Sequence, residues 1–459
     1  MMNRKRFAPV LLCAALVAGN LVGCGRQEPD APPLEAGNET QGSSVSAAEE
    51  SISTPEEREP APEESASARE DSGGAKESGD SREEEAGREI PEVMIEPFEV
   101  PDTEALRFVH DMKIGWNLGN TFDAINDGWT GDELDLESSW CGIKTTKDMI
   151  DDIKEAGFNS VRVPVSWHNH VDENYQISEA WLNRVQEVVD YVYDNGMYVI
   201  LNIHHDNSES FLYPDSARLE QSIQYVTTIW EQLCGRFGEY DQHLVFECMN
   251  EPRLVGSQYE WWINANAEEC KDAISCINEI NQAFVDTVRG SGSGNATRYL
   301  MVPGYDASPD GALNEGFVLP TDAEGVEGRL IVSVHAYTPY NFALQGPGEN
   351  GSTAKFDSDS PGSTADIRNF MDKLYKKYTG NGIPVVIGEF GARDKDGNVQ
   401  DRIDYATYYI AAARARGISC FWWDNNAFSG DGENFGIYRR RQGKFLYPEI
   451  VTGLMKYAD

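Results

Sequence analysis

The chain has 459 residues and a formal net charge of −39 at pH 7, from 77 acidic and 38 basic side chains. So acidic a protein is repelled by phosphate groups, which argues against nucleic acid and anionic lipid surfaces as partners and favours a neutral substrate. The length allows one large domain or two ordinary ones, and the spacing of the eight cysteines matches no zinc site.

Residues 1–23 have the pattern of a secretory signal peptide. Three basic residues in MMNRKR precede the apolar run FAPVLLCAALVAGNLVG, which is too short for a comfortable membrane span. The run stops at Leu-Val-Gly-Cys24, which is typical of a bacterial lipobox, where the cysteine is lipidated and becomes the mature N-terminus. We therefore expect Cys24 to be a lipid anchor. The alternative is an ordinary signal peptide that contains a cysteine.

Residues 24–98 are predicted to be a disordered acidic linker behind that anchor. From Gly25 to Phe98 the chain is rich in Glu, Pro, Ser, Ala and Gly, with 21 acidic against 6 basic residues and almost no large apolar side chains. Such a segment cannot bury enough apolar surface to fold, and its charges repel one another. A lipid anchor followed by a long acidic linker predicts an extracytoplasmic domain that is lipid-anchored at the bacterial cell surface. The envelope is either Gram-positive or of the outer-membrane type.

Residues 99–459 alternate short apolar runs with longer amphipathic ones, which is typical of repeated βα units around a parallel sheet. Eight runs have the composition of strands: 112–118, 160–165, 198–205, 244–250, 298–303, 330–337, 384–390 and 418–424. Helices are predicted at 145–157, 178–196, 221–238, 276–290, 363–380, 401–417 and 448–458. The pattern predicts an α/β fold, a (β/α)8 TIM barrel. A doubly wound open sheet is disfavoured, because no GxGxxG follows the first strand and no Walker loop is present.

Polar side chains finish most of these strands, and in a TIM barrel the carboxyl ends of the strands form the mouth that holds the active site. Burying so many polar groups around one mouth costs stability unless they are used. Glu251 and Glu389 end the fourth and seventh strands, and glycoside hydrolysis requires two facing carboxylates. The full set is Arg162, His204, His205, Asp206, Asn250, Glu251, His335, Tyr337, Glu389, Trp422, Trp423 and Asp424.

Strand geometry restricts this site further. Glu247 lies four residues before Glu251, roughly 13 Å deeper along an extended strand, so we expect a structural acid paired inside or beneath the barrel. Alternation sends Asn250 and Glu251 to opposite sides, so the strand end has to twist or bulge if both serve the site. The same alternation separates His204 from His205, and we expect no metal and no cofactor.

The domain resembles glycoside hydrolase family 5, the cellulase family of retaining (β/α)8 enzymes with catalytic glutamates on strands four and seven. The resemblance spans residues 103–457 and rests on an ordered set of motifs: KIGWNLGNTFDA, GFNSVRVPVSW, VILNIHHD, NEP, HAY, VIGEFGA and FWWDN. The motifs WNLGNT, HHD and WWDN are similar to those of the branch that contains endo-β-1,4-glucanases, lichenases, xyloglucanases and some xylanases.

The resemblance implies that Glu251 is the general acid/base and Glu389 the nucleophile of a double displacement. It also implies substrate or transition-state contacts, which we expect from Asn117, Arg162, His204, His205, Asn250, His335, Tyr337 and Trp423. Among these, Asn250 is expected at the sugar 2-hydroxyl and Trp423 beneath a sugar ring.

The two glutamates are expected to differ in pKa. A cation at Arg162 and a donor at Tyr337 would keep the pKa of Glu389 low. A less polar pocket and the negative charge of Glu389 would raise the pKa of Glu251, so that it is protonated near neutral pH.

The resulting expectation is a monomeric, endo-acting β-1,4-glucan hydrolase, with β-glucan as its polysaccharide partner and membrane contact only through the lipid anchor. A xyloglucanase, a xylanase or a β-mannanase is the alternative within the family, because the motifs cover the cleaved subsite and not the loops that read branches. A sugar-binding lipoprotein without catalysis is disfavoured by the two glutamates.

Two smaller features are left open by the sequence. Extra aromatic residues are either sugar platforms or packing residues, namely Trp140, Trp167, Trp261 and Trp262. Cys270 and Cys276 are the one close cysteine pair in the folded part, and export permits a disulfide between them.

Overall fold

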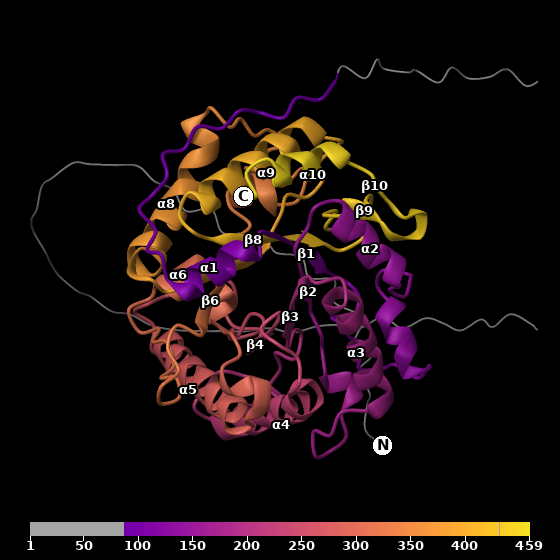
Figure 1. Ribbon diagram of the computed structural model, residues 1–459, viewed down its shortest axis with the longest axis vertical. Helices are drawn as coiled ribbons and strands as arrows, with labels where there is room; N and C mark the ends of the chain where they lie inside the picture. Colours follow the sequence, from indigo (N-terminus) through magenta and orange to yellow (C-terminus); the bar gives the residue numbers. More distant parts are fainter. Residues whose placement is uncertain (1–86, 431) are drawn as a thin grey trace, which may run out of the picture. The chain divides into compact units, whose positions relative to one another are not determined.

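Eight parallel strands close into a barrel (Figure 1), in a computed structural model that describes residues 87–430 and 432–459. The strands are β1 Ile114–Leu118, β2 Ser160–Val163, β3 Tyr198–Asn202, β4 Leu244–Glu247, β5 Leu300–Pro303, β6 Leu330–His335, β7 Val385–Phe390 and β8 Ser419–Asp424. Each strand pairs with the next, and β1 closes the barrel against β8. The predicted (β/α)8 class is confirmed. The predicted signal peptide, Cys24 and residues 24–86 of the linker lie outside the described residues.

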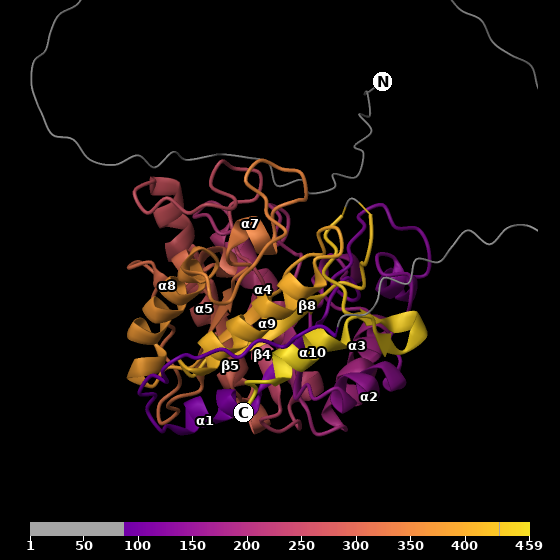
Figure 2. The same cartoon turned by 90° about the horizontal axis from the view of Figure 1, so that it is seen from above.

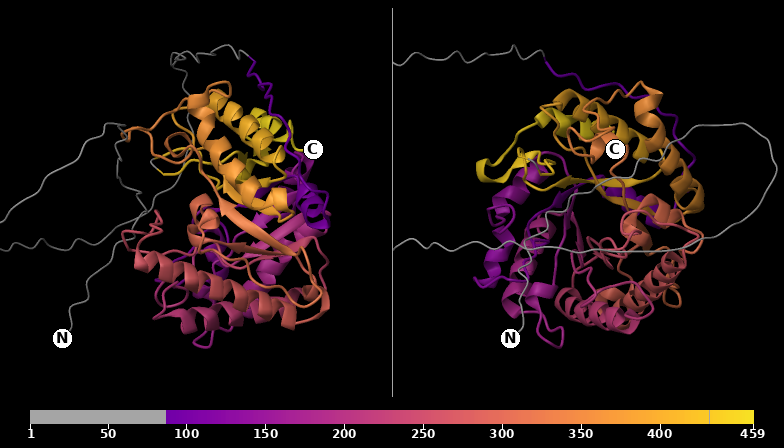
Figure 3. Two further views of the ribbon diagram at one scale, coloured as in Figure 1. Left: turned by 90° about the vertical axis from the view of Figure 1, so that its left-hand side faces the viewer. Right: turned by 180° about the vertical axis from the view of Figure 1, so that it is seen from behind.

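Helices surround the barrel (Figure 3) and present one apolar face to the strands. In α3 the buried residues recur every three or four positions, at Trp181, Val185, Val188 and Val192. None of the helices in the described part of the chain is long and apolar enough to cross a membrane. The helices are α1 Glu104–Asp111, α2 Lys147–Glu155, α3 Glu179–Tyr193, α4 Leu219–Phe237, α5 Glu268–Gly290, α6 Pro309–Leu313, α7 Tyr340–Ala343, α8 Pro361–Lys377, α9 Val399–Arg414 and α10 Pro448–Met455, with a small antiparallel pair β9 Tyr438–Arg439 and β10 Lys444–Phe445.

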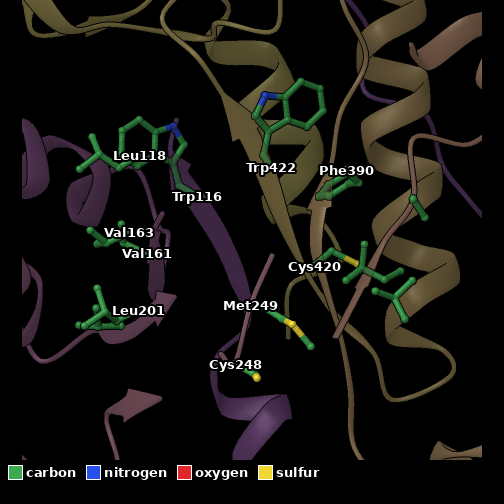
Figure 4. Packing of buried hydrophobic residues seen from close by; sticks show 14 of the residues in the cluster. Trp116, Leu118, Val161, Val163, Leu201, Cys248, Met249, Phe390, Cys420 and Trp422 are labelled. Carbon is green, nitrogen blue, oxygen red and sulfur yellow. The ribbon is translucent and has the colours of Figure 1, made fainter. Parts of the chain in front are cut away.

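The main hydrophobic core lies between the strands and the helices. Alternate residues of each strand face outward into it, such as Val161 and Val163 of β2 (Figure 4). Trp116 of β1 and Trp422 of β8 belong to the same buried cluster. This alternation sends the intervening residues, among them Arg162, into the interior of the barrel.

A second, smaller core fills the amino-terminal end of the barrel. It is made of inward-facing residues and of α1, which closes this end: Ala105, Val109, Met112, Ile200, Val245, Tyr299, Met301, Ile331, Val386 and Phe421. Figure 2 shows α1 at the lower end and α7 at the upper end, among the loops of the mouth. We call this smaller core the apolar plug. Gly115 of β1 makes room for it, because a Cβ there would lie 2.0 Å from the ring of Phe421.

Several strands end earlier than predicted, always at the mouth. The expected ends 165, 205, 250 and 337 become Val163, Asn202, Glu247 and His335. The residues beyond these ends are still buried, as Ile203, Cys248 and Met249 show, so the apolar pattern continues after the ladder has stopped. The register also shifts at Val334/His335 and between Ile387 and Phe390.

The amino-terminal boundary of the barrel domain lies earlier than expected. Residues 87–98 fall within the predicted disordered linker, yet they run along α9 and α10. Val93 N donates to the Tyr457 hydroxyl at 2.8 Å, and Phe98 N donates to Ala415 O at 2.9 Å. The ring of Phe98 packs edge-on against Tyr375 at 4.7 Å. This part of the linker is therefore an ordered strap on the barrel.

Cys270 and Cys276 both lie on α5 and both are free thiols. Six residues along one helix place two side chains on different faces, so a disulfide between them does not form here.

Candidate active site

A fully buried polar layer lies inside the barrel above the apolar plug. At its centre Arg162 donates from Nε to Glu247 at 2.7 Å and from Nη1 to Asn117 at 3.1 Å. Glu247 also accepts from Ser333 Oγ at 2.6 Å and from Asn202 Nδ2 at 3.1 Å. Glu247 is thus the structural acid that the sequence predicted, paired inside the barrel.

Glu389 stands on this layer near the end of β7. Its Oε1 accepts from Arg162 Nη1 at 2.7 Å, and its Oε2 accepts from the Tyr337 hydroxyl at 2.8 Å. Burial, followed by the charges of Glu389 and Glu251, raises the pKa of Tyr337 well above its usual value, so the hydroxyl keeps the proton that it donates. Both expected partners of the carboxylate are in place, and together they fix its orientation.

Glu251 comes after β4 has ended, where the chain leaves the ladder and enters the mouth. Its Oε1 lies 2.8 Å from His335 Nδ1, and its Oε2 lies 3.4 Å from Arg253 Nη1. His335 also approaches the deeper acid, with Nε2 at 4.0 Å from Glu247 Oε1. One imidazole ring therefore lies between the two glutamates of this segment. Because both carboxylates reach this one ring, their oxygens are closer together than the separation of about 13 Å expected along an extended strand.

The two carboxylates of the mouth lie close together. One oxygen of Glu251, one oxygen of Glu389 and a ring nitrogen of His335 are all within 4.8 Å of one another. Carboxyl groups of retaining glycosidases are about 5–5.5 Å apart, whereas inverting enzymes leave about 6.5–9.5 Å for a water. The short separation favours a covalent intermediate and retention.

The proton of the Glu251–His335 pair resides on the imidazole. Burial raises the pKa of Glu251, but the hydrogen bond and charge of His335, with the charges of Arg253 and His205, outweigh it and lower the pKa. Burial lowers the pKa of His335, but Glu389 and Glu251 outweigh it and raise the pKa. The expectation of a raised Glu251 pKa is therefore wrong for this arrangement, because it left out the imidazole at Oε1. The pair titrates as one unit, and its proton moves within a hydrogen bond whose nitrogen and oxygen are 2.8 Å apart.

The floor of the mouth combines one amide with flat rings. Asn250 Oδ1 accepts from Arg162 Nη2 at 2.7 Å, which turns its Nδ2 donor outward. Trp423 stacks parallel to His204 with ring centroids 5.8 Å apart. Burial keeps the pKa of His204 well below its usual value, so this ring is neutral at pH 7. Gly119 in the WNLGNT motif allows the close packing, since a Cβ there would lie 2.9 Å from the Trp423 ring.

Asn117 and Arg162 do not reach the mouth, contrary to the substrate contacts expected of them. Both side chains are 0% exposed. Asn117 Nδ2 donates to Gly388 O at 2.9 Å, while every nitrogen of the Arg162 guanidinium has a protein acceptor. Their role is to hold Glu389 and Asn250 in place from below.

His204 and His205 both face the mouth, contrary to the alternation argument. β3 ends at Asn202, so strand geometry no longer separates them, and their ring centroids are 4.4 Å apart. A nitrogen of each ring and an oxygen of Asp123 lie within 4.8 Å of one another. The carboxylate of Asp123 accepts from the backbone N–H groups of Asn120 at 2.9 Å and Thr121 at 2.6 Å, so it already closes the turn after β1.

Three further candidates from the strand ends support the scaffold. Asp206 accepts from the backbone N–H groups of Trp167 and His168. Asp424 accepts from Trp116 Nε1 at 3.1 Å and from the backbone of Tyr438. Trp422 packs in the main core.

Arg253 was missed by the sequence reasoning, although it directly follows the NEP motif. Its guanidinium lies 4.1 Å above the ring of Trp261, and its Nε is 3.7 Å from Glu260 and 3.8 Å from Asp306. Asp306 adopts a left-handed backbone with φ of 56°, a conformation that collects at functional sites. In the sequence, only the position of Arg253 directly after the NEP motif indicated this charge cluster beside Glu251.

Comparisons with known proteins agree with this geometry. The family model described as Cellulase (glycosyl hydrolase family 5) matches residues 120–429. Endoglucanase B of Ruminococcus albus is 44% identical over 360 residues, which cover 78% of this chain and 81% of that protein. Cellulase/esterase CelE of Acetivibrio thermocellus is 42% identical over 361 residues, which cover 78% of this chain and only 41% of that longer protein.

Solved structures extend the likeness to three dimensions. A family 5 lichenase from Caldicellulosiruptor sp. F32, solved as a mutant with cellotetraose, is 57% identical with a TM-score of 0.81, covering 81% of this chain and 100% of that one. A broad specificity endoglucanase from Ruminococcus champanellensis with bound cellotriose is 44% identical with a TM-score of 0.70, covering 78% and 100%. The chain belongs to glycoside hydrolase family 5, the cellulase family, and its barrel is an endo-acting, retaining β-glucan hydrolase of the endoglucanase type.

Proposed function

We propose that this barrel cleaves internal β-1,4 bonds of cellulose or mixed-linkage β-glucan, with Glu389 as nucleophile and Glu251 as general acid/base. The observation that carries the proposal is the pair of carboxylates within 4.8 Å, each with different partners. Glu389 is held by Arg162 and Tyr337, as suits a group that attacks, while Glu251 shares a proton with His335, as suits a group that gives and takes one.

In the first step a carboxylate oxygen of Glu389 bonds to the anomeric carbon while the bond from that carbon to the glycosidic oxygen breaks. The shared proton passes from His335 Nδ1 to Glu251 Oε1 and on to the departing oxygen. Asn250 donates to the 2-hydroxyl, a contact that strengthens in the transition state, and Trp423 stacks under the ring.

In the second step a water attacks the anomeric carbon and its proton moves to the Glu251 carboxylate. The ester bond to Glu389 breaks, and the carboxylate returns to Arg162 and Tyr337. Two inversions give net retention at the anomeric carbon.

The choice of polymer is supported by the relatives' names. A 57% identical solved structure is called a lichenase and several others are called broad specificity endoglucanases. We therefore propose mixed-linkage β-glucan as the preferred polymer. Xyloglucan, xylan and β-mannan are the alternatives within the family.

For the whole protein we propose a monomer, lipid-anchored at Cys24 on the outside of a bacterial cell. The lipobox and the acidic composition of residues 24–86 support this, and the net charge of −39 supports a neutral polysaccharide over a nucleic acid as partner. Labelled palmitate incorporated by the wild type and absent from Cys24→Ala is the expected result. Equal labelling of both would contradict the anchor.

Reducing-sugar release tests the activity and the two roles. We expect release from barley β-glucan and carboxymethylcellulose, and a fall of at least about a hundredfold in Glu389→Ala and in Glu251→Ala. Glu155→Ala, an exposed glutamate on α2, is the control and is expected to act as wild type. A folded wild type that releases no sugar from β-glucan, cellulose, xyloglucan, xylan or mannan would overturn the proposal in favour of a sugar-binding lipoprotein.

A further inference from the structure

Arg253 holds the side chain of Glu251 from a single nitrogen. Its Nη1 donates to the backbone oxygen of Glu251 at 3.0 Å and lies 3.4 Å from Oε2 of the same residue. The other carboxylate oxygen, Oε1, lies 2.8 Å from His335 Nδ1. The ring of Trp261, one of the aromatic residues that the sequence left open, lies 4.1 Å from the guanidinium and supports it. Both oxygens of Glu251 therefore have a nitrogen partner, and the protein alone orients this carboxylate.

Two further carboxylates face the Nε of Arg253. Nε lies 3.7 Å from Glu260 Oε1 and 3.8 Å from Asp306 Oδ1, which is within ion-pair distance but too far for a hydrogen bond. Among the residues that the structure describes, neither Nε nor Asp306 Oδ1 has a hydrogen-bond partner, although both atoms are buried. A buried donor and a buried acceptor thus face each other unbonded, while Nη1 of the same guanidinium is bonded on the Glu251 side.

The two additional acids are placed by backbone contacts of their own loops. Glu260 Oε2 accepts from the backbone N–H of Gly256 at 2.9 Å, within the loop after β4. Asp306 follows β5 with a left-handed φ of 56°, and its N–H donates to Pro252 O at 2.8 Å. A non-glycine residue keeps such a conformation only where its surroundings enforce it. The fold therefore holds two anions beside Arg253 without relying on a bond from the guanidinium.

The charges around Glu251 act on it in opposite directions. Burial raises the pKa of Glu251, while His335 and then Arg253 are the strongest influences that lower it. Burial, followed by the negative charge of Glu251, raises the pKa of Asp306 well above its usual value. Because two charges influence each other mutually, an ionised Asp306 also raises the pKa of Glu251 and so opposes Arg253. The other charged or titratable groups that surround Glu251 and Arg253 are His205 after β3, Glu260 after β4, His335 on β6, Glu389 on β7 and Glu433 after β8.

We propose that Arg253 is a positioning residue for the proton transfers of Glu251. Glu260 and Asp306 offset its charge, so that Glu251 can take up a proton as well as release one. The inference rests on the proposed function, in which Glu251 gives a proton in the first step and takes one in the second. An unopposed cation at Oε2 would keep Glu251 ionised and slow the first step, whereas the absence of a cation would keep it protonated and slow the second.

The first variant removes the cation. Arg253→Met keeps a long side chain over Trp261 but carries no charge. The Glu251–His335 pair then binds its shared proton more tightly. The alkaline limb of kcat/KM, measured by reducing-sugar release from barley β-glucan, is expected to move to higher pH by about half to one unit. Arg368→Met changes an exposed arginine on α8 and is expected to leave the limb in place.

The second variant removes the two additional acids. Glu260→Gln/Asp306→Asn keeps the size of both side chains and leaves Arg253 unopposed. The shared proton is then lost more easily, so the alkaline limb is expected to move to lower pH, opposite to its shift in Arg253→Met. Asp310→Asn, which removes an exposed carboxylate in the first turn of α6, is the matched control and is expected to have the limb of the wild type.

A third variant separates the charge of Arg253 from its fit. Arg253→Lys restores a cation, so its alkaline limb is expected to lie close to that of the wild type. Its kcat is expected to fall, because an ammonium on a flexible stem fixes the carboxylate of Glu251 poorly. A merely structural role of Arg253 would lower kcat in these variants without moving the limb.

The outcomes separate this charge balance from the activity itself. Limbs that stay in place, or that move in the same direction in Arg253→Met and Glu260→Gln/Asp306→Asn, overturn the role of Arg253 while the hydrolase assignment stands. Should Arg253→Met fail to fold, the acid variant decides alone, and a limb that stays in place or moves to higher pH overturns the inference. A folded wild type that releases no sugar from β-glucan overturns the proposed function and this inference with it.

Discussion

At the scale of single residues, the two catalytic candidates show how neighbours divide the work between identical side chains. Glu389 faces the fixed cation Arg162 and a phenol that keeps its proton, whereas Glu251 faces an imidazole whose pKa is raised above its usual value, mainly by the negative charge of Glu389. Both glutamates were predictable, because each lies within a motif at the mouth end of a predicted strand. The imidazole contact was not, because His335 is 84 residues away from Glu251 and the sequence carries no sign of which ring nitrogen it offers.

The shared proton makes a pH profile the direct test of this pair. In the wild type, the active form holds one proton on the Glu251–His335 pair. This proton is lost at the raised pKa of His335, so we expect kcat/KM to fall only above pH 6.5, the usual pKa of histidine. In His335→Asn the largest influence that lowers the pKa of Glu251 is gone, so this pKa rises, and the proton sits on the carboxyl group alone. We expect the alkaline limb of kcat/KM on β-glucan to move to lower pH.

The matched control for that profile is His110→Asn, an exposed histidine on α1 at the closed end of the barrel. Its alkaline limb is expected to coincide with that of the wild type. An alkaline limb that stays in place in His335→Asn would show that Glu251 alone holds the catalytic proton.

At the scale of elements, the position of each strand could be predicted from the sequence, but the residue at which several strands end near the mouth could not. Apolar residues such as Ile203, Cys248 and Met249 continue the strand pattern beyond the last ladder pair, because they are buried by the loops of the mouth. The spacing of apolar residues along the sequence cannot distinguish a residue buried in a sheet from one buried under a loop. The functional side chains that follow are therefore aimed by irregular backbone, which is why His204 and His205 face the same way.

Gly115 offers a test of how tightly the strands pack around the plug. Gly115→Ala places a methyl group against the ring of Phe421, at 2.0 Å in the unrelaxed structure, so the ring or the strand has to move. We expect the free energy of unfolding to fall by about 1–3 kcal/mol, measured by chemical denaturation. Gly235→Ala on α4 is the control, because nothing lies within 4 Å of its Cβ, and it is expected to be neutral or slightly stabilising.

The double variant Gly115→Ala/Phe421→Leu isolates the contact. If the methyl group acts through this ring, the two changes are not additive and the pair is less destabilising than their sum. Additive losses would assign the effect of Gly115→Ala to the strand backbone instead.

At the scale of the whole molecule, composition predicted that the folded domain starts at residue 99, whereas residues 87–98 also lie against the barrel. Ile90, Val93, Ile95 and Phe98 are half-buried on the barrel, yet they are spread among charged residues and prolines. A window that averages composition over residues 24–98 reads them as part of the acidic linker. Residues 87–98 can be identified as a strap only from their contacts with α9, α10 and the chain end, which are more than 300 residues away in the sequence.

The strap leads to a prediction about where the folded domain begins. A chain that starts at Gly87 keeps Phe98 against Tyr375 and the guanidinium of Arg416, together with the hydrogen bonds from Val93 and Phe98; a chain that starts at Glu99 loses all of them. At about 0.5–1.5 kcal/mol for an aromatic pair and a similar amount for each hydrogen bond, the shorter chain is expected to be less stable by about 2–4 kcal/mol. Its kcat on β-glucan at a temperature where both chains are folded is expected to match that of the longer chain, since the hydrogen bonds and ring contacts of the strap are made to α8, α9, α10 and the chain end and not to Glu251 or Glu389. Equal denaturation midpoints for the two chains would show that residues 87–98 rest on the barrel without stabilising it.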